Sequence, residues 1–243
     1  MMIVYTFGPA WGSADLSPFC VKLQTWLRMA GLAYEPRIGN IRKLPKGKLP
    51  ALELDGTILT DSTQIIEHLQ QRHGDPLRDG ARSPVELAVA RAMRGMIESE
   101  LYFANLYQRW AGDANFRIVQ PTMANYAMQV GAPAWLAPTL MRSARRQMMR
   151  QLDMQGLGRH NAAEIAQIGI SGYRAISDFL DNKVYMLGAE PSTLDATAFA
   201  FLHTLLIPPF ASPIKDYVAS RSNLVEYHDR MLARWWPELR QNV

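Results

Sequence analysis

Cysteine is nearly absent from this chain of 243 residues, which contains only Cys20. A single thiol excludes an intramolecular disulfide, so the fold is not a disulfide scaffold, and it suits a reducing compartment. The five histidines and the one cysteine show no metal-ligand spacing. No G-x-G-x-x-G or phosphate-loop motif occurs either. The sequence therefore predicts no metal site, and it carries neither of these nucleotide-binding motifs.

Long hydrophobic runs are also lacking. The most apolar stretch, Phe199 to Phe210, is 12 residues long and contains His203 and two prolines. It is too short to span a bilayer and is typical of a buried helix. Residues 1–10 contain no basic segment followed by an apolar one, so we expect no signal peptide and a cytoplasmic location.

Charge of either sign is modest, at 20% of residues against 48% hydrophobic, which is ordinary for a globular protein. The formal net charge is +4. The one dense basic cluster is Arg142, Arg145, Arg146 and Arg150, whose spacing places them on one helix face. No basic stripe is interleaved with aromatics, so we expect no nucleic-acid partner. The cluster is either a solvated helix face or a site for an anion or a membrane surface.

The first 76 residues alternate strand and helix signals. Residues 3–7 are β-prone, Ser17-Pro18 supplies an N-cap and first-turn proline, Gly31 closes that helix, and residues 33–38 form a second strand. Residues 51–54 and 57–59 flank Asp55-Gly56, a strong hairpin signal, and Asp61 opens a helix that ends at Gly74. The order β-α-β-β-β-α predicts a thioredoxin-like domain with a four-stranded mixed sheet.

Strand signals disappear after a linker at residues 77–84, so we expect an all-helical domain over residues 85–243. Helices are predicted at residues 85–110, 140–152, 162–180 and 224–236. Residues 112–139 contain three prolines and are predicted to be irregular. Ser192-Thr193-Leu194-Asp195 is a capping box ahead of an apolar helix.

Four local features, in this order along the two domains, resemble the glutathione transferases. They are Ser17 to Cys20, Lys48-Leu49-Pro50, Asp61-Ser62, and Ser192 to Asp195. A narrower resemblance covers nearly the whole chain and points to the failed-axon-connections and metaxin-like branch. It is carried by residues 8–12, 17–20, 26–31, 156–160 and 195–199.

The resemblance implies that Ser17 contacts and stabilises the glutathione thiolate. A hydroxyl and a helix N-terminus both favour the anion of a thiol whose pKa is otherwise near 8.5. The alternative is that Ser17 is only an N-cap. Cys20 lies in the first helical turn, where the helix dipole lowers a thiol pKa, so it is a second candidate. The pattern Ser-Pro-Phe-Cys lacks the first cysteine of a dithiol, and a buried inert thiol is the alternative.

Binding of the tripeptide is implied at two segments. In Lys48-Leu49-Pro50, a cis Leu49-Pro50 bond turns the Leu49 backbone outward to pair with the glutathione peptide. Asp61 and Ser62 open a helix whose free N–H groups suit the glutamyl carboxylate, although capping by Asp61 is an alternative.

A second substrate would lie against aromatic residues. Trp11 precedes Ser17, and Tyr102 is located where the family borders its second-substrate pocket. Both aromatics are also compatible with the core. Arg159-His160 is either a polar turn or a site.

These expectations define three functions. The first is a transferase that conjugates glutathione, as substrate or cosubstrate, to a small hydrophobic electrophile. The second is a non-catalytic adaptor of metaxin-like type. The third is a glutathione-dependent thiol reductase that uses Cys20. The resemblance is compatible with a homodimer, and the sequence does not identify the electrophile.

Overall fold

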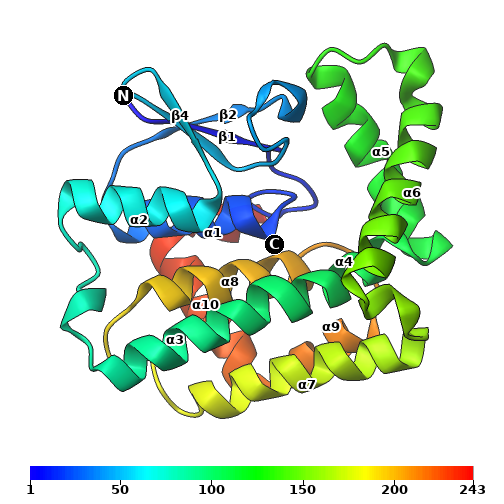
Figure 1. Ribbon diagram of the computed structural model, residues 1–243. Helices are drawn as coiled ribbons and strands as arrows, with labels where there is room; N and C mark the ends of the chain where they lie inside the picture. The colour runs from blue at the N-terminus through cyan, green and yellow to red at the C-terminus, as the bar shows by residue number, and fades with distance from the viewer. Residues whose placement is uncertain (243) are drawn as a thin grey trace.

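The computed structural model describes residues 1–242, and its N-terminal part contains a four-stranded mixed sheet (Figure 1). The strands are β1 (Ile3–Thr6), β2 (Glu35–Ile38), β3 (Ala51–Leu54) and β4 (Thr57–Thr60). Their order is β2-β1-β3-β4, with β1 and β2 parallel and the other pairs antiparallel. The predicted thioredoxin-like order is confirmed.

Two helices, α1 (Pro18–Met29) and α2 (Ser62–His73), cover one face of this sheet (Figure 1). Val4 and Leu52 of the sheet are fully buried in one cluster with Trp26 of α1 and Ile65 of α2. Burial of this apolar face stabilises the short strands, which would be marginal alone. The Leu49-Pro50 bond is cis, as predicted, and it immediately precedes β3, an interior strand of the sheet.

The C-terminal part is helical, and its bounds follow in chain order. The helices are α3 (Pro84–Met96), α4 (Tyr102–Trp110), α5 (Asp113–Gln129), α6 (Ala137–Gln155), α7 (Ala162–Leu180), α8 (Thr193–Leu206), α9 (Pro213–Ala219) and α10 (Ser222–Trp235). A π-helical turn, Ile97–Leu101, joins α3 to α4. Short 3-10 turns occur at Ile41–Lys43, Asp79–Ala81, Ala134–Leu136, Leu157–Arg159 and Pro237–Asn242.

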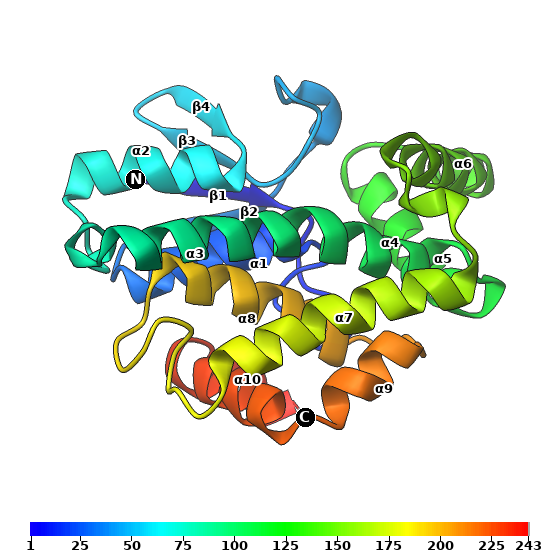
Figure 2. The same cartoon turned by 60° about the horizontal axis from the view of Figure 1, so that its bottom comes forward.

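Helix α8 is the central element of the helical part, with α3, α7 and α10 around it (Figure 2). Its residues from Leu194 to Leu205 are all buried, and it packs against α1 of the thioredoxin-like domain. The predicted capping box is present: the Ser192 backbone N–H and hydroxyl both donate to the fully buried Asp195 carboxylate, at 2.8 and 2.6 Å. No helix among residues 1–242 is long and apolar enough to cross a membrane.

The prediction that residues 112–139 are irregular is wrong. Most of this segment is α5, which continues through Pro121. An interior proline removes one backbone hydrogen bond and costs about 3 kcal/mol. Phe116, Val119 and Tyr126 are buried on one side of α5, while Pro121 is exposed. Packing of that apolar side offsets the cost, which local propensity does not reveal.

The Arg159-His160 segment and the basic cluster of α6 lie on the surface. Arg159 is within salt-bridge distance of Asp153 at 3.6 Å and His160 contacts Glu164 at 3.2 Å, and all four side chains are exposed. This supports the polar-turn interpretation of Arg159-His160. In α6, Arg142, Arg146 and Arg150 are exposed, whereas Arg145 pairs with Asp113 at 2.7 Å.

Candidate functional site

Ser17 is located at the N-cap of α1, but its hydroxyl does not cap the helix. The residue is half-buried with extended backbone, and no N–H of the first turn donates to its side chain. The Ser17 backbone N–H is itself taken by the Asp15 carboxylate, at 2.9 Å. The hydroxyl lies on the side of the Cys20 thiol, where its interaction only partly opposes the rise in the thiol pKa that burial causes. The capping alternative for the Ser17 hydroxyl is therefore not realised, although Ser17 occupies the N-cap position of α1.

Asp15 is a buried carboxylate that organises the loop between β1 and α1. It is 1% exposed, and it also accepts the Gly8 backbone N–H at 2.9 Å. Burial raises its pKa from 3.8 to about 7, against the opposing effect of the two backbone hydrogen bonds. The loop that leads into Ser17 is thus held by one side chain whose charge changes near neutral pH.

Cys20 lies beneath this loop and is fully buried. It belongs to a small apolar cluster with Leu49 and Tyr126. Burial, followed by the neighbouring Asp15 charge, raises the pKa of the Cys20 thiol well above its usual range. A thiol that is neither exposed nor acidic is a poor nucleophile. The structure brings Ser17, Cys20 and Leu49 together, and Cys20 has the environment of a packed thiol.

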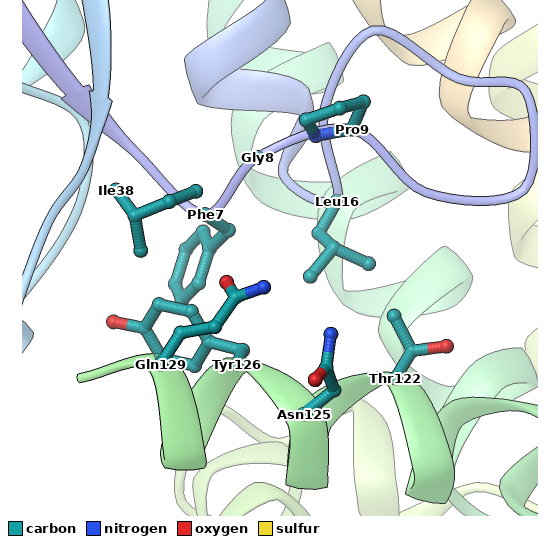
Figure 3. A pocket seen from close by; sticks show the side chains of 9 residues that line it. All are labelled: Phe7, Gly8, Pro9, Leu16, Ile38, Thr122, Asn125, Tyr126 and Gln129. Atoms are coloured by element: carbon teal, nitrogen blue, oxygen red, sulfur yellow. The ribbon is translucent and has the colours of Figure 1, made fainter. Parts of the chain in front are cut away.

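A cleft of about 340 Å³ opens between this loop and α5 (Figure 3). On the loop side Phe7, Pro9 and Leu16 face it, together with Ile38 at the end of β2. On the other side three polar residues of α5, at spacings of three and four, face the cleft: Thr122, Asn125 and Gln129. None of the nine lining residues is charged, so the cleft suits an uncharged ligand.

Tyr126 fixes the width of this cleft. Its hydroxyl donates to the Gly39 carbonyl at 2.7 Å, and its ring lies 4.9 Å from the Phe7 ring. The Asn40 side chain adds a bond to the Val130 carbonyl at 3.2 Å. These contacts hold α5 against the thioredoxin-like domain at the end of β2.

The start of α2 is the expected carboxylate site. Asp61 caps the helix by accepting the N–H groups of Thr63 and Gln64 at 3.0 and 3.2 Å, so the capping alternative is realised. Ser62 is 4% exposed and Lys48 is exposed. Beneath this helix start lies Lys22 of α1, whose ammonium donates to Thr63 at 2.7 Å. The region therefore holds a buried cation as well as the helix N-terminus.

The two aromatic candidates occupy different places. Trp11 packs edge-on against Phe210 at 4.9 Å and lines neither described cavity, which supports a packing role. Tyr102 packs against Phe19 with the rings tilted and their centroids 5.0 Å apart, and it lines a second, smaller cavity between α1, α4 and α8.

No group of histidine, cysteine or carboxylate side chains within residues 1–242 is arranged to hold a metal ion.

Two family models match the chain. The glutathione S-transferase N-terminal domain matches residues 18–115, and the glutathione S-transferase C-terminal domain matches residues 169–231. An isoprene-epoxide–glutathione S-transferase from Rhodococcus sp. (strain AD45) is 33% identical over 242 residues, covering 95% of this chain and 98% of that one. The chain belongs to the glutathione S-transferase superfamily.

This glutathione S-transferase superfamily member is also similar to Failed axon connections and the metaxins. Failed axon connections from Drosophila melanogaster is 32% identical over 92% of this chain, which spans 55% of that protein's length. Metaxin-2 from Mus musculus is 24% identical over 77% of this chain and 69% of its own. Among solved structures, a β-etherase from Sphingobium sp. has a TM-score of 0.63 at 21% identity, covering 100% of this chain and 99% of that one. This last similarity shows the fold alone.

Sequence reasoning missed Asp15, Lys22 and Tyr126. Asp15 lies in a Gly- and Pro-rich loop with no periodicity to show which side chains turn inward. Lys22 is a charged residue within a helix, and its partner Glu98 is 76 positions away along the chain. Tyr126 falls in the segment that was predicted to be irregular. Residues 8–12 and the Ser17 to Cys20 segment, which flank Asp15, did point to this loop.

Proposed function

We propose that this protein conjugates glutathione to a small, uncharged electrophile in the cleft between the β1–α1 loop and α5. The observation that carries the proposal is the hydroxyl of Ser17 at the N-terminus of α1, which makes no capping hydrogen bond to the helix. A hydroxyl donor and the positive end of a helix dipole both stabilise a thiolate. The uncharged cleft lies directly beside it, because Leu16 lines the cleft and precedes Ser17.

Glutathione would extend from Ser17 toward the start of α2. Its peptide would pair with the Leu49 backbone, and its glutamyl carboxylate would approach Ser62. Asp61 occupies two N–H groups of this helix, so the Ser62 N–H and hydroxyl are the donors assigned to the ligand. The buried Lys22 ammonium below, which is paired with Glu98 at 2.5 Å, donates to Thr63 and so braces this first turn of α2.

The thiol-reductase function receives no support from the geometry, because Cys20 is fully buried and its pKa is raised. The adaptor function is supported by the similarity to Failed axon connections and the metaxins. An adaptor of this fold has no need to bind the tripeptide, so glutathione occupancy separates it from the transferase.

The test is calorimetric titration with glutathione, followed by conjugation assays with iodoethane and a chlorodinitrobenzene. We expect saturable binding, and binding about tenfold weaker for Cys-Gly, which has no glutamyl group. Ser62→Ala should weaken glutathione binding, whereas the matched control Ser143→Ala, on the exposed face of α6, should not. The absence of heat and of thermal stabilisation at millimolar glutathione would favour the adaptor.

A further inference from the structure

The loop between β1 and α1 is held at three consecutive residues, each through a different contact. The Ala14 backbone N–H donates to the His203 imidazole of α8, and the Leu16 carbonyl accepts from Arg109 of α4 at 3.0 Å. These two contacts attach the loop to the helical part of the molecule. Asp15 lies between them, and its side chain attaches the loop to the segment that follows β1.

The two oxygens of the Asp15 carboxylate join two points of this loop. Its Oδ1 accepts the Ser17 N–H at 2.9 Å and closes a local turn, while its Oδ2 accepts the Gly8 N–H at 2.9 Å on the far side of the loop. The Leu16 N–H donates to the Gly8 carbonyl beside it, at 3.2 Å. Gly8 and Leu16 both line the cleft (Figure 3). One carboxylate thus sets the place of Ser17 relative to the sheet and to the edge of the cleft.

This bridge depends on the charge of Asp15. An ionised carboxylate only accepts, so it holds both N–H groups, and bonds to a charged acceptor are the stronger ones. A proton on Oδ2 makes that oxygen a donor and a poor acceptor, and it then faces the Gly8 N–H, which also donates. The Gly8 N–H keeps the Thr6 hydroxyl, at 3.2 Å. Protonation therefore releases the turn that carries Ser17 from the end of β1.

The other ionisable side chains packed around the loop come from five helices and keep their charge near neutral pH. They are Cys20 of α1, Arg109 of α4, Tyr126 of α5, His203 of α8 and, behind it, His228 of α10. Burial raises the pKa of the thiol and of the phenol, lowers the pKa of both imidazoles, and leaves the guanidinium with a pKa of about 10. The pKa of Asp15 is about 7, so its charge is the one that changes in this range.

We propose that Asp15 is a positioning residue for the conjugation: its ionised carboxylate ties the Ser17 turn to the end of β1 and so holds the Ser17 hydroxyl at the glutathione sulfur, and its protonation releases the turn. This inference rests on the proposed conjugating function. A nearby negative charge disfavours a thiolate. If Asp15 acted through its charge alone, its neutralisation would favour the thiolate, whereas loss of the tie disfavours it. The sign of the change therefore separates positioning from charge.

The first test measures the thiolate of bound glutathione by its ultraviolet absorbance as a function of pH. Asp15→Asn is a neutral isostere whose Nδ2 cannot accept an N–H, so it cannot bridge the loop. At pH 7 its fraction of bound thiolate should be about threefold lower than in wild type, as in Ser17→Ala. The double variant should show no further loss, because both changes remove the same interaction.

The matched control is Asp195→Asn. Asp195 is also a fully buried carboxylate that accepts two backbone N–H groups, from Met186 and Ser192, both at 2.8 Å. It lies at the start of α8, where the neighbouring Thr193 hydroxyl accepts from Trp26 near the other end of α1. Its replacement should lower stability and leave the fraction of bound thiolate at the wild-type value.

The second test uses the wild-type protein without ligand and follows its backbone amide resonances by NMR. The Gly8 and Ser17 amide protons should shift together with a midpoint near pH 7, and the Ala30 amide at the other end of α1 should not. If neither amide titrates, the inference is wrong, even if Asp15→Asn does not fold. An unchanged or higher thiolate fraction in Asp15→Asn also overturns it, while the proposed function stands. If wild type binds no glutathione and conjugates neither electrophile, the proposed function fails and the inference with it.

Discussion

The Nε2 atom of His203 accepts a hydrogen bond from the backbone N–H of Ala14 at 3.2 Å, joining residues 189 positions apart. A backbone N–H always donates, so the proton of this imidazole is on Nδ1, which faces His228 Nε2 at 3.1 Å. The remaining His228 nitrogen donates to Asp229 at 3.0 Å. The loop that carries Asp15 and Ser17 is therefore anchored to α8 and α10 through two neutral histidines.

His203→Phe should loosen this loop and change the pH dependence of stability. It leaves the Ala14 N–H unpaired, and we expect a loss of about 2 kcal/mol in the free energy of unfolding. Burial lowers the pKa of His203 to about 3, so between pH 6.5 and pH 4 the unfolded chain binds the extra proton. His203 therefore makes wild type more stable as pH rises over this range, and His203→Phe lacks this contribution. Urea unfolding at several pH values measures the slope of the free energy of unfolding against pH.

Asp15→Asn should change the same slope in the opposite direction. The folded pKa of Asp15 is about 7 against 3.8, so between these values the folded chain holds the extra proton. Protonated Asp15 therefore stabilises the folded state at low pH. This contribution, on the order of 4 kcal/mol in total, is lost as pH rises through about 7. Between pH 4 and pH 6.5, Asp15 and His203 have opposite effects on the pH dependence of stability. The free energy of unfolding of wild type should therefore change little with pH because of these two residues. Asp15→Asn should then gain stability with rising pH and His203→Phe should lose it. If the free energy of unfolding depends on pH in the same way in wild type and in both variants, the pKa shifts assigned to Asp15 and His203 are wrong.

The sequence predicted elements whose signals are local. The helix at 162–180 and the Ser192–Asp195 capping box agree with the structure to the residue, because caps and apolar periodicity define them. Residues 113–129 were missed because tertiary packing, and not propensity, keeps Pro121 in a helix. The site was predicted where a motif marks it, at Ser17. Asp15 and Lys22 were not predicted, since their burial depends on elements far along the chain.

Removal of Glu98 should destabilise the protein more than removal of its partner Lys22. The Lys22 ammonium lies 2.5 Å from the Glu98 carboxylate, and the side chains are 0% and 19% exposed. Glu98→Gln leaves a fully buried cation without its counter-charge, a loss of about 3–5 kcal/mol. Lys22→Met leaves the Glu98 carboxylate, which reaches solvent, so the loss of stability should be smaller. Combining Glu98→Gln with Lys22→Met should cause little further loss.

The control for this pair is Glu67→Gln. Glu67 lies 4.0 Å from Arg94 and is 58% exposed, so its loss should change the free energy of unfolding by less than about 0.5 kcal/mol. Thermal unfolding of wild type and the four variants in one buffer provides the comparison. Equal losses for Glu98→Gln and Lys22→Met would show that hydration of the ammonium, and not the ion pair, determines the cost.

Ser17 and Cys20 should separate activity from stability. The Ser17 hydroxyl does not cap α1, so Ser17→Ala should not carry the loss of about 1 kcal/mol that is usual for an N-cap. It removes a donor to the thiolate, and we expect a rate about tenfold lower with saturating glutathione, equivalent to about 1.4 kcal/mol. Cys20→Ala removes a packed side chain from the cluster with Leu49 and Tyr126, so it should lower stability by about 1–2 kcal/mol and leave the rate within about twofold. The measurement is conjugation of iodoethane well below the melting temperature of each variant, together with urea unfolding. If Cys20→Ala is inactive while Ser17→Ala reacts at the wild-type rate, the chemistry takes place at the buried thiol, and the burial of Cys20 has to be relieved during turnover.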